Sequence, residues 1–236
     1  MKKIPGLVGR VRIGTPDSSL TPASGVVAIA EMVGRLGAVT ALDDAIGSIK
    51  KRDRGLSAGE YLVAVAQAQM LGAQFWTGLD RRRADAAGQA LSAVATPAST
   101  TAVDLAERFG PAQLAGIEEG IGEIVGRVVR LLSATRRTVL RAGTVTIDLD
   151  GTDVEVYGSK KKGIAYSYKG ARAGRPHVAT WAEAGVVTAA DLLAGDEDPR
   201  PGAGALIARS VATLRTAGVS ARPVVRAGRA LRALPA

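Results

Sequence analysis

The sequence predicts an α+β protein in which a mainly helical N-terminal region, residues 1–143, precedes a β-rich region, residues 144–236. Through much of the first region apolar residues recur every three or four positions, which is the period of an amphipathic helix. After Thr144 short runs of alternating apolar and polar residues replace that pattern, as is typical of half-buried strands. We expect the second region to form an antiparallel meander, then a helix, then a further strand.

The composition limits the classes of site that the chain can carry. The 236 residues are 47% apolar, which suffices for one large domain or two modest ones. Only 3% are aromatic, so the core must be mainly aliphatic. The absence of cysteine excludes disulfides and thiolate zinc sites, and the single histidine, His177, excludes a polyhistidine site. Any metal ion would therefore be held by carboxylates.

The chain is strongly basic, with a net charge of +9 and a pI of about 10.2. Lys and Arg exceed Asp and Glu in both regions, so the charge is not confined to a tail. Such a balance fits a polyanionic partner, most often nucleic acid, although solubility alone could also account for it. No apolar run approaches the ~18 residues of a membrane span, and no secretory signal is recognisable. We expect a cytoplasmic protein without a membrane partner.

Helices are predicted wherever apolar positions keep helical spacing. Ser57 and Glu60 match a capping box, and Ser99 is the expected N-cap of a later helix. The arginines at 81–83 are expected on a solvated face. Two helices meet near residues 110–111; a helical bundle is favoured there over a DNA-reading helix-turn-helix. The predicted helices cover residues 23–37, 39–49, 61–71, 100–109 and 111–132, and residues 133–143 are expected to be a connection.

Strands are predicted from the alternating runs of the second region. The acidic residues 196–198 are expected to form a turn that leads into the following helix. The predicted strands cover residues 144–150, 154–157, 164–168, 177–182, 186–193 and 222–226, and the predicted helix covers residues 203–217.

The first of these strands carries the candidate metal ligands. Ile147 and Leu149 alternate with Asp148 and Asp150, so one side is apolar and the other bears two carboxylates. Asp is depleted in strands, which suggests that these two have a function. Mg²⁺ prefers oxygen ligands and is usually held by one or two carboxylates together with phosphate oxygens. The alternative is a strand at a sheet edge with both acids in water.

A series of motifs in the second region resembles insertion-sequence transposases of the DDE group 1 type. The likeness runs from about Thr144 to Arg226, and a helical N-terminal region is also typical of that family. It implies a partial ribonuclease H-like catalytic domain and DNA transposition by cleavage and strand transfer, in which an Asp-Asp-Glu triad holds two divalent ions. The motifs are residues 147–158 (IDLDGTDVEVYG), 165–170 (AYSYKG), 175–177 (RPH) with 180–181 (TW), and 190–195 (ADLLAG) with 197–202 (EDPRPG).

The resemblance assigns roles to single residues. The family's first aspartate precedes Gly-Thr, which makes Asp150 the implied catalytic residue and metal ligand. Asp148, on the same strand face, is the second candidate metal ligand. Mg²⁺ is the implied cofactor, and the terminal inverted repeats of a transposon are the implied DNA partner. A homodimer is an assembly that the sequence leaves open.

The chain departs from the family after its last predicted strand. In the family the second aspartate follows a Val-Val-Arg-Ala run, but here residues 224–227 are followed by Gly228. No Asp or Glu occurs after Asp198, so the second aspartate and the glutamate of the triad are both absent. We hypothesise that the reading frame was truncated or shifted near Ala227, which would leave an inactive transposase fragment.

A basic segment without acids is the candidate DNA-binding surface. No Asp or Glu lies between Glu155 and Glu183, and two tyrosines, Tyr166 and Tyr168, are interleaved with the basic residues. Cationic side chains in such loops would neutralise backbone phosphates. The alternative is a solvated hairpin. The candidate DNA-binding residues are Lys160, Lys161, Lys162, Lys169, Arg172 and Arg175.

Three functions therefore remain open from the sequence. The first is a truncated DDE transposase that retains DNA binding. The second is a non-catalytic DNA-binding regulator that occupies transposon ends without cutting them. The third is a helical interaction protein, which would show no affinity for DNA.

Overall fold

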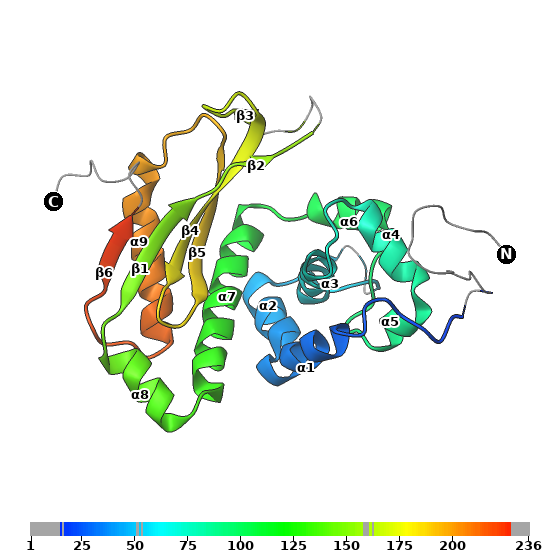
Figure 1. The fold of residues 1–236 in the computed structure, drawn as a ribbon, viewed down its shortest axis with the longest axis horizontal. Helices are drawn as coiled ribbons and strands as arrows, with labels where there is room; N and C mark the ends of the chain where they lie inside the picture. The colour runs from blue at the N-terminus through cyan, green and yellow to red at the C-terminus, as the bar shows by residue number, and fades with distance from the viewer. Residues whose placement is uncertain are drawn as a thin grey trace, which may run out of the picture. The chain divides into compact units, whose positions relative to one another are not determined.

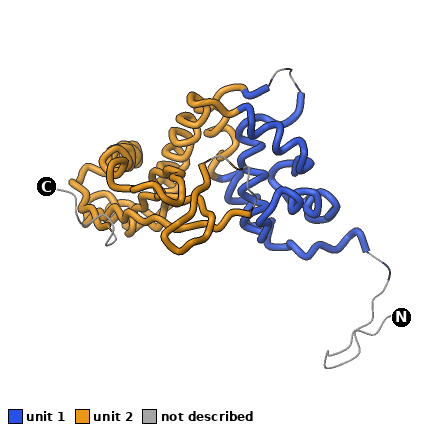
Figure 2. The backbone as a smooth tube through the Cα atoms, turned by 90° about the horizontal axis from the view of Figure 1, so that it is seen from above, with its two compact units in different colours: residues 1–35, 49–108 blue, residues 36–48, 109–236 orange. Residues whose placement is uncertain are grey.

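The computed structural model describes residues 15, 17–50, 52, 54–157, 161 and 163–227. The chain forms two compact units: the first comprises residues 1–35 and 49–108, the second residues 36–48 and 109–236 (Figure 2). The α+β class is confirmed, because a helical N-terminal half precedes a mixed sheet of six described strands and a C-terminal helix. No helix among the described residues is long and apolar enough to cross a bilayer.

Every helix or strand that the structure describes in the first unit is a helix. The capping box is confirmed, since the Glu60 amide donates to Ser57 Oγ over 3.1 Å and the Ser57 amide donates to Glu60 Oε2 over 2.7 Å. Ser99 is not an N-cap as predicted: the cap position is Ala98, and the Ser99 amide donates to Asp80 Oδ1 over 2.9 Å. The helices are α1 (Val26–Leu36), whose last residue belongs to the second unit, α3 (Ala58–Met70), α4 (Thr77–Ala84), α5 (Ala86–Ala90) and α6 (Ser99–Ala106).

Two glycines bring helices α2 (Ala38–Ile46) and α7 (Pro111–Leu131) of the second unit close together (Figure 1). A Cβ built on Gly116 would lie 2.5 Å from the Ala45 carbonyl oxygen, and one on Gly120 would lie 2.9 Å from Leu42 Cδ2. Because these glycines are four residues apart, they share one face of α7. Valines 125 and 129 of α7 instead join the core beneath the sheet. Helix α7 thus belongs by its packing with the sheet, although the change in sequence pattern comes only at Thr144.

Residues 133–143 contain a helix where the sequence predicted a connection. Helix α8 (Ala134–Ala142) begins after Ser133, whose Oγ accepts a hydrogen bond from the Arg136 amide. Its single buried side chain is that of Leu140, which joins the core of the sheet. With three arginines and only two large apolar residues, this segment lacks the apolar stripe on which the prediction relied.

The sheet is centred on its longest strand, β4 (Arg172–Trp181). Strand β1 (Thr146–Gly151) pairs antiparallel with β4 on one side, and β5 (Val186–Ala194) pairs antiparallel with it on the other. Strand β6 (Val224–Ala227) lies beyond β1 and runs parallel to it, after the crossing helix α9 (Arg200–Thr216). The short strands β2 (Val154–Glu155) and β3 (Ala165–Tyr166) pair with the first residues of β4.

Strand β4 begins five residues earlier than predicted. The predicted strand covered residues 177–182, and proline is usually found only at the edges or ends of strands. The structure nevertheless pairs Pro176 with Leu192 inside the sheet, and the Pro176 carbonyl oxygen accepts a hydrogen bond from the Thr152 amide over 3.2 Å. The residues added to the strand are those that hold β2 and β3.

The two faces of the sheet differ in burial. Side chains that point to what we call the covered face, among them Ile147, Leu149 and Trp181, are at most 3% exposed and pack with α9, where Leu206 and Leu214 are at most 1% exposed. The hydroxyl groups of Thr188 on β5 and Ser210 on α9 lie 2.6 Å apart and tie the helix to the sheet. Alternate residues point to the other side, which we call the open face; on β1 and in residues 176–180 of β4 they are exposed or half-buried.

Two leucines of the second unit provide a test of this assignment. We expect Leu206→Ala to lower the free energy of unfolding by about 2–5 kcal/mol, since it leaves a cavity in the core. Leu192→Ala, at a side chain 73% exposed on the open face, should change it by no more than about 0.5 kcal/mol. Urea unfolding followed by circular dichroism measures both values, and equal losses would contradict the assignment of the two faces.

Candidate nucleic-acid interface and carboxylate strand

The two candidate carboxylates lie on the open face. In the antiparallel register with β4, Asp148 is opposite Thr180 and Asp150 is opposite Val178. Burial of Ile147 and Leu149 on the covered face directs the alternate residues outward. Asp150 is exposed near the end of β1, and its Oδ1 accepts a hydrogen bond from the Gly151 amide over 2.9 Å. The structure thus presents Asp150 to solvent on a strand, as the sequence predicts.

Asp148 is held by a cation of the chain itself. Arg226 on β6 lies beside Asp148 in the parallel register and donates from Nε to Oδ1 and from Nη2 to Oδ2, each over 2.6 Å. These hydrogen bonds, with a smaller contribution from the charge of Arg226, lower the pKa of the Asp148 carboxyl below its ordinary value. Both oxygens that could bind a metal ion already accept hydrogen bonds from a guanidinium.

The donor set of the described residues does not fit a two-metal centre. A hard divalent ion needs several oxygen ligands that converge on one point. Of the two predicted ligands, Asp150 is a single exposed carboxylate, and Asp148 is paired with Arg226. Among the residues that the structure describes, no three His, Asp or Glu side chains come together as a metal-binding group. The implied Mg²⁺ therefore lacks most of the ligands that its chemistry requires.

Arg175 serves a structural role rather than lying free for phosphate. Its Nε donates to Asp153 Oδ1 over 2.8 Å, and its other nitrogens donate to the carbonyl oxygens of Gly195 and Glu197. The contacts join the turn after β1 to the loop that follows β5. In that loop Asp198 Oδ1 accepts from the Arg200 amide at the start of α9, which agrees with the turn expected at residues 196–198.

Three other predicted DNA-binding residues are described by the structure and lie near the paired ends of β2, β3 and β4. Lys161 and Lys169 are exposed, and Arg172 is half-buried opposite Tyr166 on β3. Lys169 Nζ lies 5.3 Å from the centre of the Tyr168 ring, within the range of a cation–π contact. Lys160 and Lys162 lie outside the described residues. The register places Arg172 and Tyr166 on the same face of the sheet as Asp150.

His177 is buried beneath the carboxylate strand. It is 1% exposed, points to the covered face, and is the register partner of Gly151 on β1 and Asp191 on β5. Burial lowers the pKa of its imidazole, against the opposing influence of the Asp191 and Asp150 carboxylates. We therefore expect a neutral packing residue, in line with its omission from the catalytic candidates.

The second unit also contains a groove of about 1160 Å³ lined by α2, α7, β5 and α9. Its charged residues pair with each other: Arg209 on α9 contacts Glu118 over 2.9 Å and Asp191 over 2.6 Å. Burial raises the pKa of Glu118, and the nearby Arg209 opposes that shift. Arg209 therefore compensates the charges of two of the carboxylates that line the groove.

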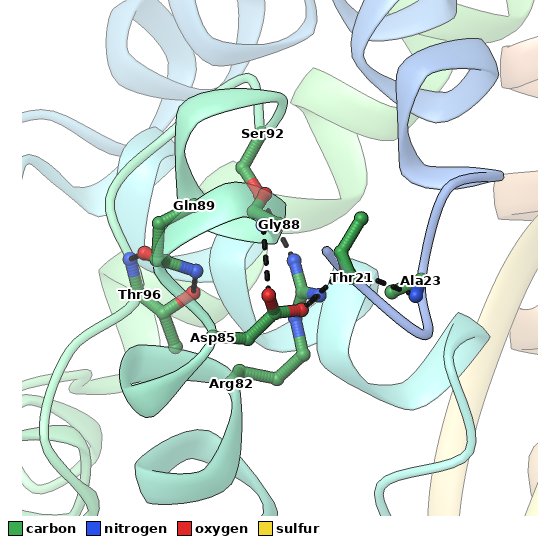
Figure 3. Close-up of polar contacts among 8 residues, drawn as sticks. All are labelled: Thr21, Ala23, Arg82, Asp85, Gly88, Gln89, Ser92 and Thr96. Atoms are coloured by element: carbon green, nitrogen blue, oxygen red, sulfur yellow. Dashed lines mark hydrogen bonds and ion pairs between the residues drawn. The ribbon is translucent and has the colours of Figure 1, made fainter. Parts of the chain in front are cut away.

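A buried polar cluster in the first unit corrects one expectation. Arg82, expected on a solvated face with its neighbours, is 8% exposed and donates to Ser92 Oγ over 2.9 Å (Figure 3). Asp85 accepts from Thr21 Oγ1 over 2.6 Å and from the Gly88 amide over 2.9 Å (Figure 3). These contacts fasten the segment before α1 to the loop between α4 and α5, so the cluster is structural. Sequence spacing gives no signal for a contact between residues 21 and 85.

The Arg226–Asp148 pair leads to a prediction about titration. We expect Arg226→Gln to raise the pKa of Asp148 toward the usual value of about 3.9, measured by ¹³C NMR of the carboxyl groups. Because the folded pKa is lowered, the pair stabilises the fold above the ordinary Asp pKa. That contribution is lost as the pH falls through the lowered value. The matched control is Arg200→Gln, which should raise the pKa of Asp198 and leave Asp148 unchanged. An unchanged Asp148 titration in Arg226→Gln would contradict the pairing.

Compared with protein-family models, curated proteins and solved structures, the chain matches none. The resemblance to DDE transposases therefore rests on the ordered motifs between Thr144 and Arg226.

Proposed function

We propose that the chain is a DNA-binding protein derived from a DDE transposase, which holds DNA over Asp150 but does not by itself cut or join strands. The ribonuclease H-like part of this proposal is supported by strand order. The meander β1–β4–β5 is followed by a helix that crosses to β6, parallel to β1 on the side away from β4. That order is the one expected for the opening half of such a fold.

A single observation separates DNA binding from strand transfer in this proposal. The side chain beside Asp148 is an arginine that binds both of its oxygens, and the carboxylates needed to complete a metal centre are missing from the described residues. The exposed Lys161 and Lys169 nevertheless lie in a segment without acids. The described residues therefore supply cations that complement phosphate but lack the carboxylates that the cleavage reaction requires.

The same observation favours the non-catalytic regulator as the way such a chain would act. A protein that covers transposon ends without cutting them would compete with a complete transposase for the same DNA. Cations that contact phosphates supply affinity without chemistry. The regulator and the transposase-derived fragment would then differ in biological role but bind DNA through the same surface.

Salt dependence tests the binding surface. We expect the full chain to bind a 30-base-pair duplex. The logarithm of its association constant should fall linearly with the logarithm of the NaCl concentration, with a slope of about 0.9 per phosphate contacted. Lys169→Gln should reduce that slope by about one, measured by fluorescence anisotropy at several NaCl concentrations. Arg35→Gln, at an exposed residue that pairs with Glu31 in the first unit, is the control and should leave the slope unchanged.

Two results would contradict the proposal. An affinity that does not vary with ionic strength, or no binding to any DNA, would contradict the proposed contacts with phosphates. Nicked or joined products that form with Mg²⁺ and disappear in Asp150→Asn would show that the chain is a complete enzyme.

Restoring a carboxylate provides a second prediction. In the family the aspartate follows the Val-Val-Arg-Ala run, and this chain has Gly228 there, outside the described residues. Ala227 lies beside Leu149 in the parallel register, so a strand continued by one residue would place an Asp next to Asp150. We expect Gly228→Asp to tighten Mn²⁺ binding, measured by electron paramagnetic resonance. Gly228→Asn, which adds the same bulk without charge, should not. Equal affinity in both variants would argue against the proposed site.

A further inference from the structure

Three of the four tyrosines of the chain are exposed in one part of the sheet. Tyr157, Tyr166 and Tyr168 are 68%, 67% and 82% exposed, whereas Tyr61 of the first unit is 4% exposed. The three exposed rings follow β2 or lie in and after β3, and we call them the tyrosine surface. Aromatic side chains of this size usually bury most of their area, so this concentration of exposed rings calls for a partner.

A tight turn of the backbone holds one ring of the tyrosine surface, that of Tyr168, outward. The Ser167 amide donates to the Ala171 carbonyl oxygen over 2.8 Å, and the Gly170 amide donates to the Ser167 carbonyl oxygen over 2.8 Å. Gly170 has a φ of +76°, a conformation that glycine adopts without strain. This tight turn projects Tyr168 and Lys169 into solvent while Ser167 is buried beneath them.

Cationic residues accompany the rings. Lys169 lies over the Tyr168 ring, Arg172 is the register partner of Tyr166, and Lys161 is exposed in the same segment. No acid occurs between Glu155 and Glu183. Aromatic rings alternating with cations are the chemistry that binds single-stranded nucleic acid, because bases stack on the rings while the cations contact the backbone.

We propose that the tyrosine surface binds unpaired bases of DNA by stacking, so that the protein prefers single-stranded DNA or duplex with unpaired bases over perfect duplex. The inference rests on the proposed function and deepens it by naming the form of DNA. In a perfect duplex the flat faces of the bases are hidden by their neighbours, so that the rings could contact only the grooves and the backbone. An unpaired base exposes both of its faces to a tyrosine.

The register sets a length scale for the bound strand. On the open face, Tyr166 is opposite Arg172 and Asp150 is opposite Val178, six residues further along β4. At a rise of about 3.3 Å per residue, Tyr166 and Asp150 are separated by about 20 Å along the sheet. A strand that is held by Tyr166 and reaches Asp150 must therefore span that distance.

The experiment compares three DNA forms with the full chain. Fluorescence anisotropy at 0.1 M NaCl, about the ionic strength at which the Debye length is 10 Å, would measure binding of a 30-nucleotide single strand, the perfect duplex, and the duplex with a five-nucleotide unpaired bulge. We expect the single strand and the bulged duplex to bind more tightly than the perfect duplex. Tyr166→Ala and Tyr168→Ala should each weaken single-strand binding on the order of tenfold, because stacking contributes that much per base.

Matched variants separate stacking from charge. Tyr166→Phe and Tyr168→Phe keep the ring and should bind as the wild type does. Lys169→Gln should reduce the salt slope for single-stranded DNA by about 0.7, whereas the tyrosine variants should leave that slope unchanged. Phe75→Ala removes a ring that is 59% exposed in the first unit and should have no effect. Since the substituted side chains are largely exposed, circular dichroism should show that every variant folds.

The possible failures point to different conclusions. Equal affinity for the three DNA forms, or tyrosine-to-alanine variants that bind single strands like the wild type, would overturn the stacking inference and leave the proposed DNA binding in place. Failure to bind DNA of any form would overturn both.

Discussion

The structure depends on the unequal burial of the two faces of β1. Ile147 and Leu149 pack with Trp181 and Leu206 on the covered face, and together they form the core of the second unit. Since side chains alternate along a strand, this burial leaves Asp148 and Asp150 on the open face. A slip of one residue would bury two carboxylates and expose the core, so the hydrophobic side fixes the register of the polar one. The position of the candidate site is thus a consequence of how the core packs.

Arg226 binds Asp148, one of the two residues that the family resemblance suggests as metal ligands. The guanidinium of Arg226 binds both oxygens of Asp148 and compensates its charge without an added cation. The pair is exposed to solvent, which screens its charges, so it contributes little to the stability of the fold. The pair matters because of what it does to the candidate site. Strand β1 carries two carboxylates, but the described residues contain no group of three carboxylate or imidazole side chains that could hold a metal ion.

Under the proposed function, DNA binding and strand transfer are separate properties of the chain. The described candidate DNA-binding residues lie around the short strands β2 and β3 and the start of β4, where Tyr168 and Lys169 extend from a tight turn. Arg175, from the same basic segment, instead joins the loop after β5 to the turn after β1 and so supports the shape of this surface. The proposed function therefore assigns DNA binding to this surface and no strand cleavage to the carboxylate strand.

The sequence by itself determined the α+β class, most helices and strands, and the exposure of Asp150, because these follow from local periodicity and from the alternation of a strand buried on one face. It located helix α7 but not its packing on α2 through Gly116 and Gly120, and it missed α8, whose one buried residue is Leu140. Only the tertiary structure decided that Arg226 binds Asp148, that Arg175 binds Asp153, and that Arg82 is buried. The reason is physical: these contacts join residues brought together by strand register and loop geometry, and no local pattern records a partner 78 residues away.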